Sequence, residues 1–373
     1  MTRSPTRRDM LAGTAALLVA APAHAAAAAG SLQAIAAAEG RRFGSAVAWS
    51  PPGADRGSFA NPFYARLLEA ECGLLVPENE LKWQAIRPSP TRFDFARFDA
   101  IMAYAERHGM AVRGHNLLWH QPKWLPAWLN DHDYGPQPRA EAERLLTTHI
   151  RTVIGRYGTR IGGYDVVNEA VRPADGVLYE TSLSRALGGA EPTLDLAFHT
   201  ARDAAPHAQL VYNDYMSWEP GNAHHRAGVL RLLEGFRRRG VPVDALGIQS
   251  HLVTQGTRGA AGLQEEWRRF LDAVTTMGYA LLVTELDVRD NGLPADIAVR
   301  DAGVAAYTRA YLDVTLSYPQ LRDVLCWGLC DRYSWIEGFE PRRDGARCRP
   351  TLYDTQGRAK PMRAAVAAAL AAR

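Results

Sequence analysis

Short apolar runs rich in β-branched residues alternate along the chain with longer amphipathic segments. The short runs predict eight strands, at residues 43–48, 73–77, 111–118, 161–168, 209–213, 245–250, 280–285 and 323–329. The longer segments predict helices, at residues 95–107, 140–157, 193–204, 225–239, 264–277 and 296–318. Strands that alternate with helices indicate a parallel sheet. Eight such units over about 340 residues predict an α/β fold, a closed (β/α)8 TIM barrel.

A doubly wound open sheet is the alternative architecture. It would usually carry a glycine-rich phosphate-binding turn after its first strand, and the Phe-Gly-Ser-Ala sequence at residues 43–46 is no such turn. Proline- and glycine-rich pieces at 51–57, 135–138 and 256–262 are short, so they indicate loops rather than linkers. We therefore expect a single barrel domain over residues 26–373.

The first 25 residues have the pattern of an export signal. Two adjacent arginines precede a modest apolar run at residues 11–21, and Ala23 and Ala25 are small residues at the two positions that a signal peptidase reads. The arginine pair favours a signal peptide of the twin-arginine type over residues 1–25, which predicts a periplasmic or secreted protein. An ordinary secretory signal and an alanine-rich tail are the alternatives. The apolar run is too short for a membrane anchor.

The charge of the chain argues against nucleic acid as a partner. The formal net charge is +3, and Arg3, Arg7 and Arg8 against Asp9 supply two of those charges. The rest of the chain is therefore close to neutral, which fits a neutral polymer or a small molecule better than a polyanion.

The four cysteines do not have the spacing of a metal site. They are Cys72, Cys326, Cys330 and Cys348, and none of them forms a CxxC pair. A disulfide between Cys330 and Cys348 after export and free buried thiols are both compatible with this spacing. The sequence predicts no cofactor.

Polar and aromatic residues gather where the predicted strands end. In a barrel of this kind the chemistry lies at the carboxyl ends of the strands, and seven of the eight predicted strands end in such groups. The residues of interest are Glu78, Asn79, Lys82, His115, Trp119, Asn168, Glu169, Asn213, Gln249, His251, Glu285, Asp287, Trp327 and Trp335. Each alone has a structural explanation, such as a core histidine, a packing tryptophan or a loop cap. Their common placement favours a functional site.

A metal site is the first possibility to test, because His115 and His120 lie close together in the sequence. Metal-dependent barrel hydrolases bring several histidines and an aspartate to one ion, and the Asn-Glu and Thr-Glu strand ends do not supply that set. No metal site is therefore predicted.

Two carboxylates are placed for acid and base chemistry. Glu169 ends the fourth predicted strand and Glu285 the seventh, so they can face each other across the barrel mouth. Asp287 lies two residues further, on the same side of the strand as Glu285. Paired carboxylates with amides and tryptophans are typical of a glycosidase cleft, because sugars present hydroxyl groups and apolar faces. The scarcity of Arg and Lys clusters among these strand-end motifs argues against sugar phosphates.

Six ordered segments closely resemble the motif series of glycoside hydrolase family 10, whose members are mainly endo-β-1,4-xylanases. The segments are residues 76–83, 113–120, 164–169, 247–251, 284–287 and 327–331. The resemblance extends from about residue 43 to residue 362. It implies an endo-1,4-β-xylanase that cleaves internal bonds of xylan or xylo-oligosaccharides by retaining double displacement, with Glu169 as the general acid/base and Glu285 as the nucleophile. We expect a monomer.

The resemblance also assigns roles around these two residues. Asn168 is expected to bind the 2-hydroxyl of the sugar being cleaved, and Asp287 to support His251, which contacts Glu285. The remaining residues are expected to bind substrate: Glu78, Asn79 and Lys82 at the next sugar on the non-reducing side, His115, Trp119 and Gln249 at the cleavage point, and Trp327 and Trp335 as walls.

The chain departs from the family pattern at three places. Tyr164 stands where tryptophan is common, Met216 stands where asparagine is usual, and residues 121–128 do not match the common loop. The last two departures put contacts on the leaving-group side in doubt. A β-glycanase acting on cellulose or mixed-linkage glucan and a catalytically silent carbohydrate-binding protein are the alternative functions, and the presence of both glutamates argues against the silent one.

Overall fold

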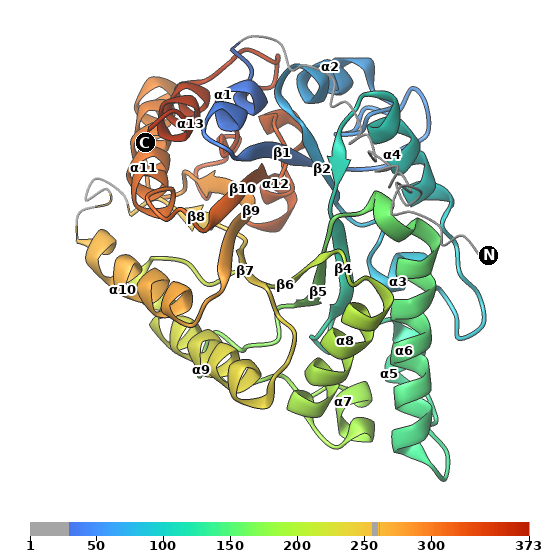
Figure 1. Ribbon diagram of the computed structural model, residues 1–373. Helices are drawn as coiled ribbons and strands as arrows, with labels where there is room; N and C mark the ends of the chain where they lie inside the picture. Colours follow the sequence, from blue (N-terminus) through green and yellow to red (C-terminus); the bar gives the residue numbers. More distant parts are fainter. Residues whose placement is uncertain (1–29, 256–259, 261, 373) are drawn as a thin grey trace, which may run out of the picture.

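The computed structural model describes residues 30–255, 260 and 262–372 and forms a barrel of parallel strands inside a ring of helices (Figure 1). The strands are β1 (Arg42–Val47), β2 (Leu74–Pro77), β3 (Ala111–Val112), β4 (Gly114–Trp119), β5 (Gly163–Asn168), β6 (Gln209–Asp214), β7 (Ala245–Ile248), β8 (His251–Val253), β9 (Ala280–Arg289) and β10 (Leu321–Cys326). The predicted export signal at residues 1–25 lies outside the described residues.

The order of the strands closes the sheet. Neighbours follow the path β3-β2-β1-β10-β9-β7-β6-β5-β4, and the pairs along it are parallel. The two ends of the path, β3 and β4, are separated only by Arg113, so they are two halves of one strand. This arrangement confirms the predicted (β/α)8 barrel and excludes the open sheet.

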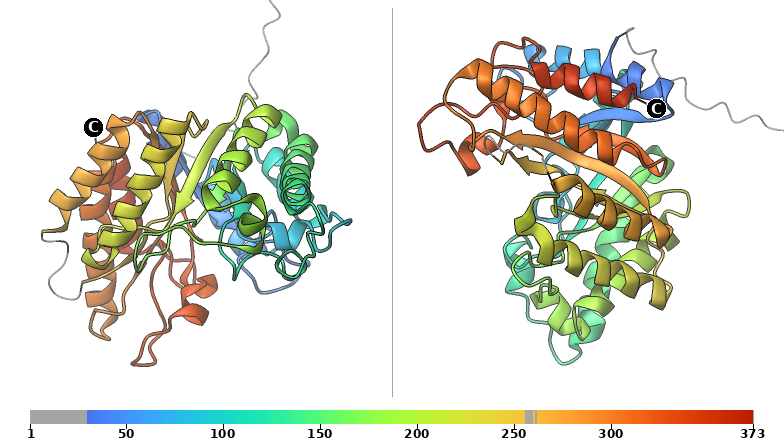
Figure 2. Two further views of the ribbon diagram at one scale, coloured as in Figure 1. Left: turned by 90° about the horizontal axis from the view of Figure 1, so that it is seen from below. Right: turned by 90° about the vertical axis from the view of Figure 1, so that its left-hand side faces the viewer.

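The six predicted helices are present, and shorter helices lie between them and at both ends of the described chain. The helices are α1 (Leu32–Ala38), α2 (Pro62–Glu71), α3 (Trp83–Ile86), α4 (Ala96–Arg107), α5 (Ala127–Asn130), α6 (Pro138–Tyr157), α7 (Ser182–Leu187), α8 (Ala190–Ala204), α9 (Ala223–Arg239), α10 (Leu263–Thr276), α11 (Ile297–Thr315), α12 (Ile336–Phe339) and α13 (Pro361–Leu370). Figure 2 shows the long helices around the outside of the barrel, with α13 packed against α11. None of the helices within the described residues is long and apolar enough to cross a bilayer.

The helices begin and end at residues whose chemistry suits those positions. Asn61 accepts a hydrogen bond from the Phe63 N–H at the start of α2, and Pro62 occupies the first helical position. Gly240 ends α9 in the left-handed conformation, with φ 69°, which glycine adopts without a steric penalty. Local sequence therefore sets the ends of the helices that connect successive strands.

Two strand boundaries differ from the prediction in ways that matter for the site. The prediction ended the seventh strand at residue 285, but β9 continues to Arg289 because β8 pairs with it and places His251 opposite Asp287. Glu285 thus lies within a strand rather than at its end. The prediction continued the eighth strand to residue 329, but β10 ends at Cys326, so Trp327 begins the following loop.

Two sequence features are resolved by packing. The four cysteines are buried and free, so the structure contains no bridge between Cys330 and Cys348 and shows the free-thiol alternative.

Tyr164 is fully buried, and its ring would lie 2.3 Å from a Cβ added at Gly114. The tyrosine at this position therefore belongs to the core, beneath the site.

Candidate active site

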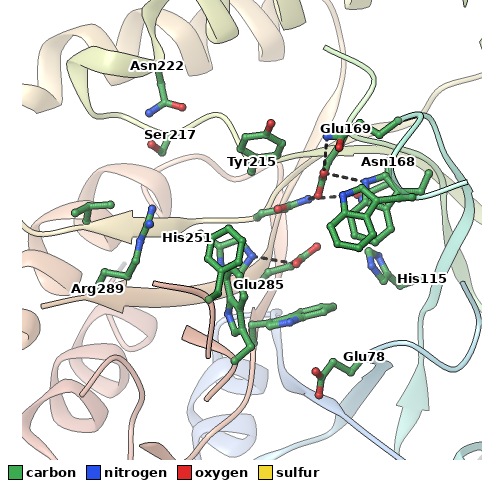
Figure 3. Close-up of a pocket in the computed structure, with 18 of the residues that line it drawn as sticks. Glu78, His115, Asn168, Glu169, Tyr215, Ser217, Asn222, His251, Glu285 and Arg289 are labelled. Atoms are coloured by element: carbon green, nitrogen blue, oxygen red, sulfur yellow. Dashed lines mark hydrogen bonds and ion pairs between the residues drawn. The ribbon is translucent and has the colours of Figure 1, made fainter. Parts of the chain in front are cut away.

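A cleft of about 910 Å³ opens at the carboxyl ends of the strands. Figure 3 shows Glu169 and Glu285 pointing into it from different strands. All of the sequence-predicted site residues except Asn213 and Asp287 line it: Glu78, Asn79, Lys82, His115, Trp119, Asn168, Glu169, Gln249, His251, Glu285, Trp327 and Trp335. Asp287 is fully buried behind the cleft wall.

Glu169 follows β5 with a backbone conformation that is unusual for a residue with a side chain. Its φ is 53°, in the left-handed region, where a non-glycine residue is strained and is often found at a functional site. Its N–H donates to the Asn213 carbonyl oxygen of β6 at 2.9 Å. This conformation turns the side chain into the cleft at the point where β5 ends.

Three donors surround the Glu169 carboxyl group. Gln249 Nε2 donates to Oε1 at 2.8 Å, and Trp119 Nε1 and Gln121 Nε2 donate to Oε2 at 2.8 and 3.3 Å (Figure 3). Burial nevertheless raises the pKa of Glu169 to about 7, with help from the negative charges of Asp214 and Glu285 and against the bonds from Gln249 and Trp119. The group can therefore carry a proton at neutral pH.

The surroundings of Glu285 favour the opposite charge state. Asn213 Nδ2 donates to Glu285 Oε1 at 2.8 Å, and His251 Nε2 lies 3.2 Å from Oε2. Burial works to raise the pKa of Glu285, but the bond from His251, the nearby His115 and the bond from Asn213 outweigh it, so its pKa is lowered. Glu285 is thus held as a carboxylate.

Asp287 supports this arrangement from behind. His251 Nδ1 lies 2.9 Å from Asp287 Oδ1, and Trp335 Nε1 donates to Asp287 Oδ2 at 2.8 Å. Burial disfavours the charged imidazole, but Asp287 and Glu285 together overcome that effect and raise the pKa of His251 to about 10. A protonated His251 therefore lies between two carboxylates and orients Glu285.

A chain of amides joins the two glutamates. Asn168 Oδ1 accepts hydrogen bonds from Asn213 Nδ2 at 2.8 Å and from Gln249 Nε2 at 3.3 Å. The same two amides donate to Glu285 and Glu169. Because both protein donors use the oxygen of Asn168, its Nδ2 group remains as a donor for a ligand. Thr284 Oγ1 fixes the orientation of Asn213 by donating to its Oδ1 at 2.7 Å.

The loop after β2 brings a cation to the glutamates. Lys82 Nζ donates to Asn79 Oδ1 at 2.9 Å and lies 4.7 Å from the centre of the Trp119 ring. Burial lowers the pKa of Lys82, opposed by the carboxylates of Glu285, Glu78 and Glu169. This loop presents donors and acceptors to the side of the cleft marked by Glu78 in Figure 3.

His115, in the third predicted strand, and His120, just after it, have different surroundings. His115 Nδ1 lies 2.9 Å from Asp165, which also accepts from Arg113 at 2.6 Å, and the His115 ring lines the cleft. His120 is fully buried with Nε2 2.9 Å from the Tyr179 carbonyl oxygen, and burial lowers its pKa to about 4. The core explanation thus holds for His120 and not for His115.

No cluster of three or more His, Cys, Asp or Glu side chains with the arrangement of a metal site was found among the described residues.

The departures near residues 216 and 121–128 differ in how they meet the cleft. Met216 is fully buried and does not line it, whereas Ser217 and Asn222 do, on the side away from Glu78 in Figure 3. The loop after β4 reaches the cleft with Gln121 and Trp124, and the Trp124 ring stacks on Trp119 at 4.6 Å. This loop therefore forms a wall beside the carboxyl group of Glu169.

Sequence reasoning missed two contacts of the glutamates. Asn213, which could equally have been a loop cap, bridges Asn168 and Glu285. Gln121 donates to Glu169 from a loop that matched no pattern. The Asn213 signal was its position, since it ends a predicted strand like the other site residues. Gln121 carried no such signal.

Gly247 leaves the space that the Asn213 side chain occupies. A Cβ at Gly247 would lie 2.4 Å from Asn213 Oδ1, so Gly247→Ala should displace the amide from Glu285. Loss of about 1.4 kcal/mol of hydrogen bonding would lower kcat about tenfold, with a stability cost of about 1–3 kcal/mol from overpacking. The measurements are steady-state kinetics and urea unfolding. Gly163→Ala is the matched control, because its nearest contact is 3.4 Å; equal kcat in both variants would contradict the prediction.

Comparison with known proteins agrees with this geometry. A family model described as glycosyl hydrolase family 10 matches residues 31–369. Endo-1,4-beta-xylanase 3 of Hypocrea jecorina is 32% identical over 307 residues, covering 82% of this chain and 78% of that protein. Endo-1,4-beta-xylanase B of Thermotoga neapolitana is 31% identical over 291 residues, covering 78% of each. The structure of xylanase 10B from Thermotoga maritima matches with a TM-score of 0.79 and 29% identity, over 91% of this chain and 98% of that one. The chain therefore belongs to glycosyl hydrolase family 10.

Proposed function

We propose that this protein is an endo-1,4-β-xylanase that cleaves internal β-1,4-xylosidic bonds of xylan with retention, using Glu169 as acid/base and Glu285 as nucleophile. The observation that carries the proposal is the opposite shift of the two pKa values in one cleft, raised for Glu169 and lowered for Glu285. Two carboxyl groups that titrate apart have separate acid and nucleophile roles. The relatives named as endo-1,4-beta-xylanases support the substrate.

The first chemical step uses both groups at once. The Glu285 carboxylate attacks the anomeric carbon and forms a glycosyl ester, while the proton on Glu169 moves to the leaving oxygen and the glycosidic bond breaks. Protonated His251 beside Glu285 keeps the nucleophile ionised until the ester forms.

In the second step Glu169, now a carboxylate, acts as a base. As a carboxylate it takes a proton from water, the water oxygen attacks the anomeric carbon, and the ester bond to Glu285 breaks. Two inversions at the same carbon give net retention, which requires the carboxyl groups to lie roughly 5–5.5 Å apart. The amide chain through Gln249, Asn168 and Asn213 supports this pairing, because it connects the groups across one cleft.

The neighbouring side chains suit a neutral sugar chain. In this proposal Asn168 Nδ2 donates to the 2-hydroxyl of the sugar being cleaved. Glu78, Asn79 and Lys82 offer hydrogen-bonding groups for the next sugar on the non-reducing side. Trp327 and Trp335 supply apolar walls for sugar faces.

Export through the signal at residues 1–25 and a monomeric state belong to the same proposal.

The substrate is tested by comparing reducing-sugar release from xylan and from carboxymethylcellulose at equal enzyme concentration. The proposal predicts release mainly from xylan. A Glu285→Ala preparation made in parallel is the control for contaminating hydrolases, and it should be inactive on both polymers. Dominant release from carboxymethylcellulose would overturn the xylanase assignment in favour of a cellulose- or glucan-directed enzyme.

The acid role of Glu169 predicts a particular pH dependence. Because Glu169 must be protonated to donate, kcat/KM should fall as the pH rises through about 7, the pKa of this group. Glu169→Gln cannot donate a proton, so kcat/KM on xylan should drop by about 10²–10⁴-fold. With dinitrophenyl xylobioside, whose leaving group needs no proton, the loss should be far smaller. The alkaline limb of the residual activity on xylan should vanish. An alkaline limb that persists in this variant would contradict the assignment.

A further inference from the structure

A second carboxylate lies next to Glu169 but out of reach of a substrate. Asp214 is the last residue of β6, is fully buried, and does not line the cleft. It receives a hydrogen bond from the Tyr212 hydroxyl and one from the Tyr215 N–H at 2.8 Å. His225 Nε2, from α9, lies 3.0 Å from Oδ1, the oxygen that also accepts from Tyr215, within ion-pair distance. Asp214 accepts in both of these hydrogen bonds, which is the behaviour of a carboxylate.

The Tyr212 hydroxyl connects Asp214 to the backbone of the acid/base. A hydroxyl has one hydrogen, which this one donates to Asp214, so its lone pairs face the Ala170 N–H at 3.2 Å. Burial and the Asp214 charge raise the pKa of Tyr212 well above its ordinary range, so the hydroxyl keeps its hydrogen. Ala170 directly follows Glu169, whose own N–H is held by the Asn213 carbonyl oxygen. Two residues of β6, Asn213 and Tyr212, thus hold the backbone N–H groups of Glu169 and of the residue after it.

Several charged and titratable groups surround Glu169, and Asp214 is one of the negative ones. Lys82 approaches from the β2 loop and opposes the negative groups, Tyr179 and Tyr215 are neutral phenols, and Glu285 faces Glu169 from β9. Glu285 loses its charge when it becomes a glycosyl ester. Asp214 forms no bond to the sugar, so its negative charge acts on Glu169 in both steps.

We propose that Asp214 is a positioning residue for the acid/base. It orients the Tyr212 hydroxyl that holds the backbone at Ala170, and its fixed negative charge favours the protonated form of Glu169. This inference rests on the proposed acid/base role of Glu169 and assigns no contact with the substrate to Asp214.

The test removes the charge without changing the shape. Asp214→Asn should move the alkaline limb of kcat/KM to lower pH by roughly 0.5–1 unit, because a like charge no longer disfavours ionised Glu169. Asp323→Asn is the matched control: Asp323 is also fully buried, but it pairs with Arg42 near the opposite end of the barrel. That variant should leave the limb where it is, and circular dichroism verifies that both variants fold.

Tyr212→Phe separates the two parts of the proposal and remains informative if Asp214→Asn does not fold. It removes the bond to the Ala170 N–H but keeps the Asp214 charge. It should lower kcat/KM several-fold for substrates with poor leaving groups, more than for dinitrophenyl xylobioside, without moving the limb to lower pH. Equal losses for both substrate types would overturn the positioning role.

The outcomes distinguish the role of Asp214 from the proposed acid/base role of Glu169, on which it rests. If Glu169→Gln abolishes the alkaline limb but Asp214→Asn leaves it unmoved, the inference is wrong and the acid/base assignment stands. If the limb persists in Glu169→Gln, the assignment of Glu169 fails, and the role of Asp214 fails with it.

Discussion

Two buried carboxyl groups of like charge share one cleft, and the rest of the site depends on how their repulsion is resolved. The structure resolves it by giving each group different neighbours. Burial raises the pKa of Glu169, with help from the nearby Asp214 and against the hydrogen bonds that its carboxyl group accepts. Glu285 lies against His251, whose positive charge is stabilised by Asp287, so its pKa falls. Without these unequal surroundings the two glutamates would compete for one proton and neither would have a defined role.

The barrel supplies the positions from which these neighbours act. In the parallel register Asn168 pairs with Asn213, and Asn213 pairs with Gly247. These pairings place the Asn213 amide between Asn168 and Glu285, and Gly247 has no side chain to compete for that space. The hydrogen bonds that give Glu169 and Glu285 different charge states therefore depend on strand register.

The sequence predicted the barrel because strands buried on both faces leave continuous apolar runs, such as Leu281 to Val283 within β9. It predicted most cleft residues because the carboxyl ends of parallel strands meet in space. It could not predict that β8 would extend the pairing of β9 past Glu285, since that pairing joins distant segments. The bridge by Asn213 and the bond from Gln121 depend on the same kind of tertiary register, and the inward turn of Met216 depends on packing.

In the proposed mechanism Glu285 becomes covalently attached to the sugar. A dinitrophenyl 2-deoxy-2-fluoro-xylobioside tests it directly, because fluorine slows both steps while the good leaving group lets the first proceed, so the ester accumulates. Mass spectrometry of the digested protein should show one fluoroxylobiosyl group, on the peptide at Glu285. Attachment at another residue, or no attachment by an enzyme that still turns over xylan, would contradict the account.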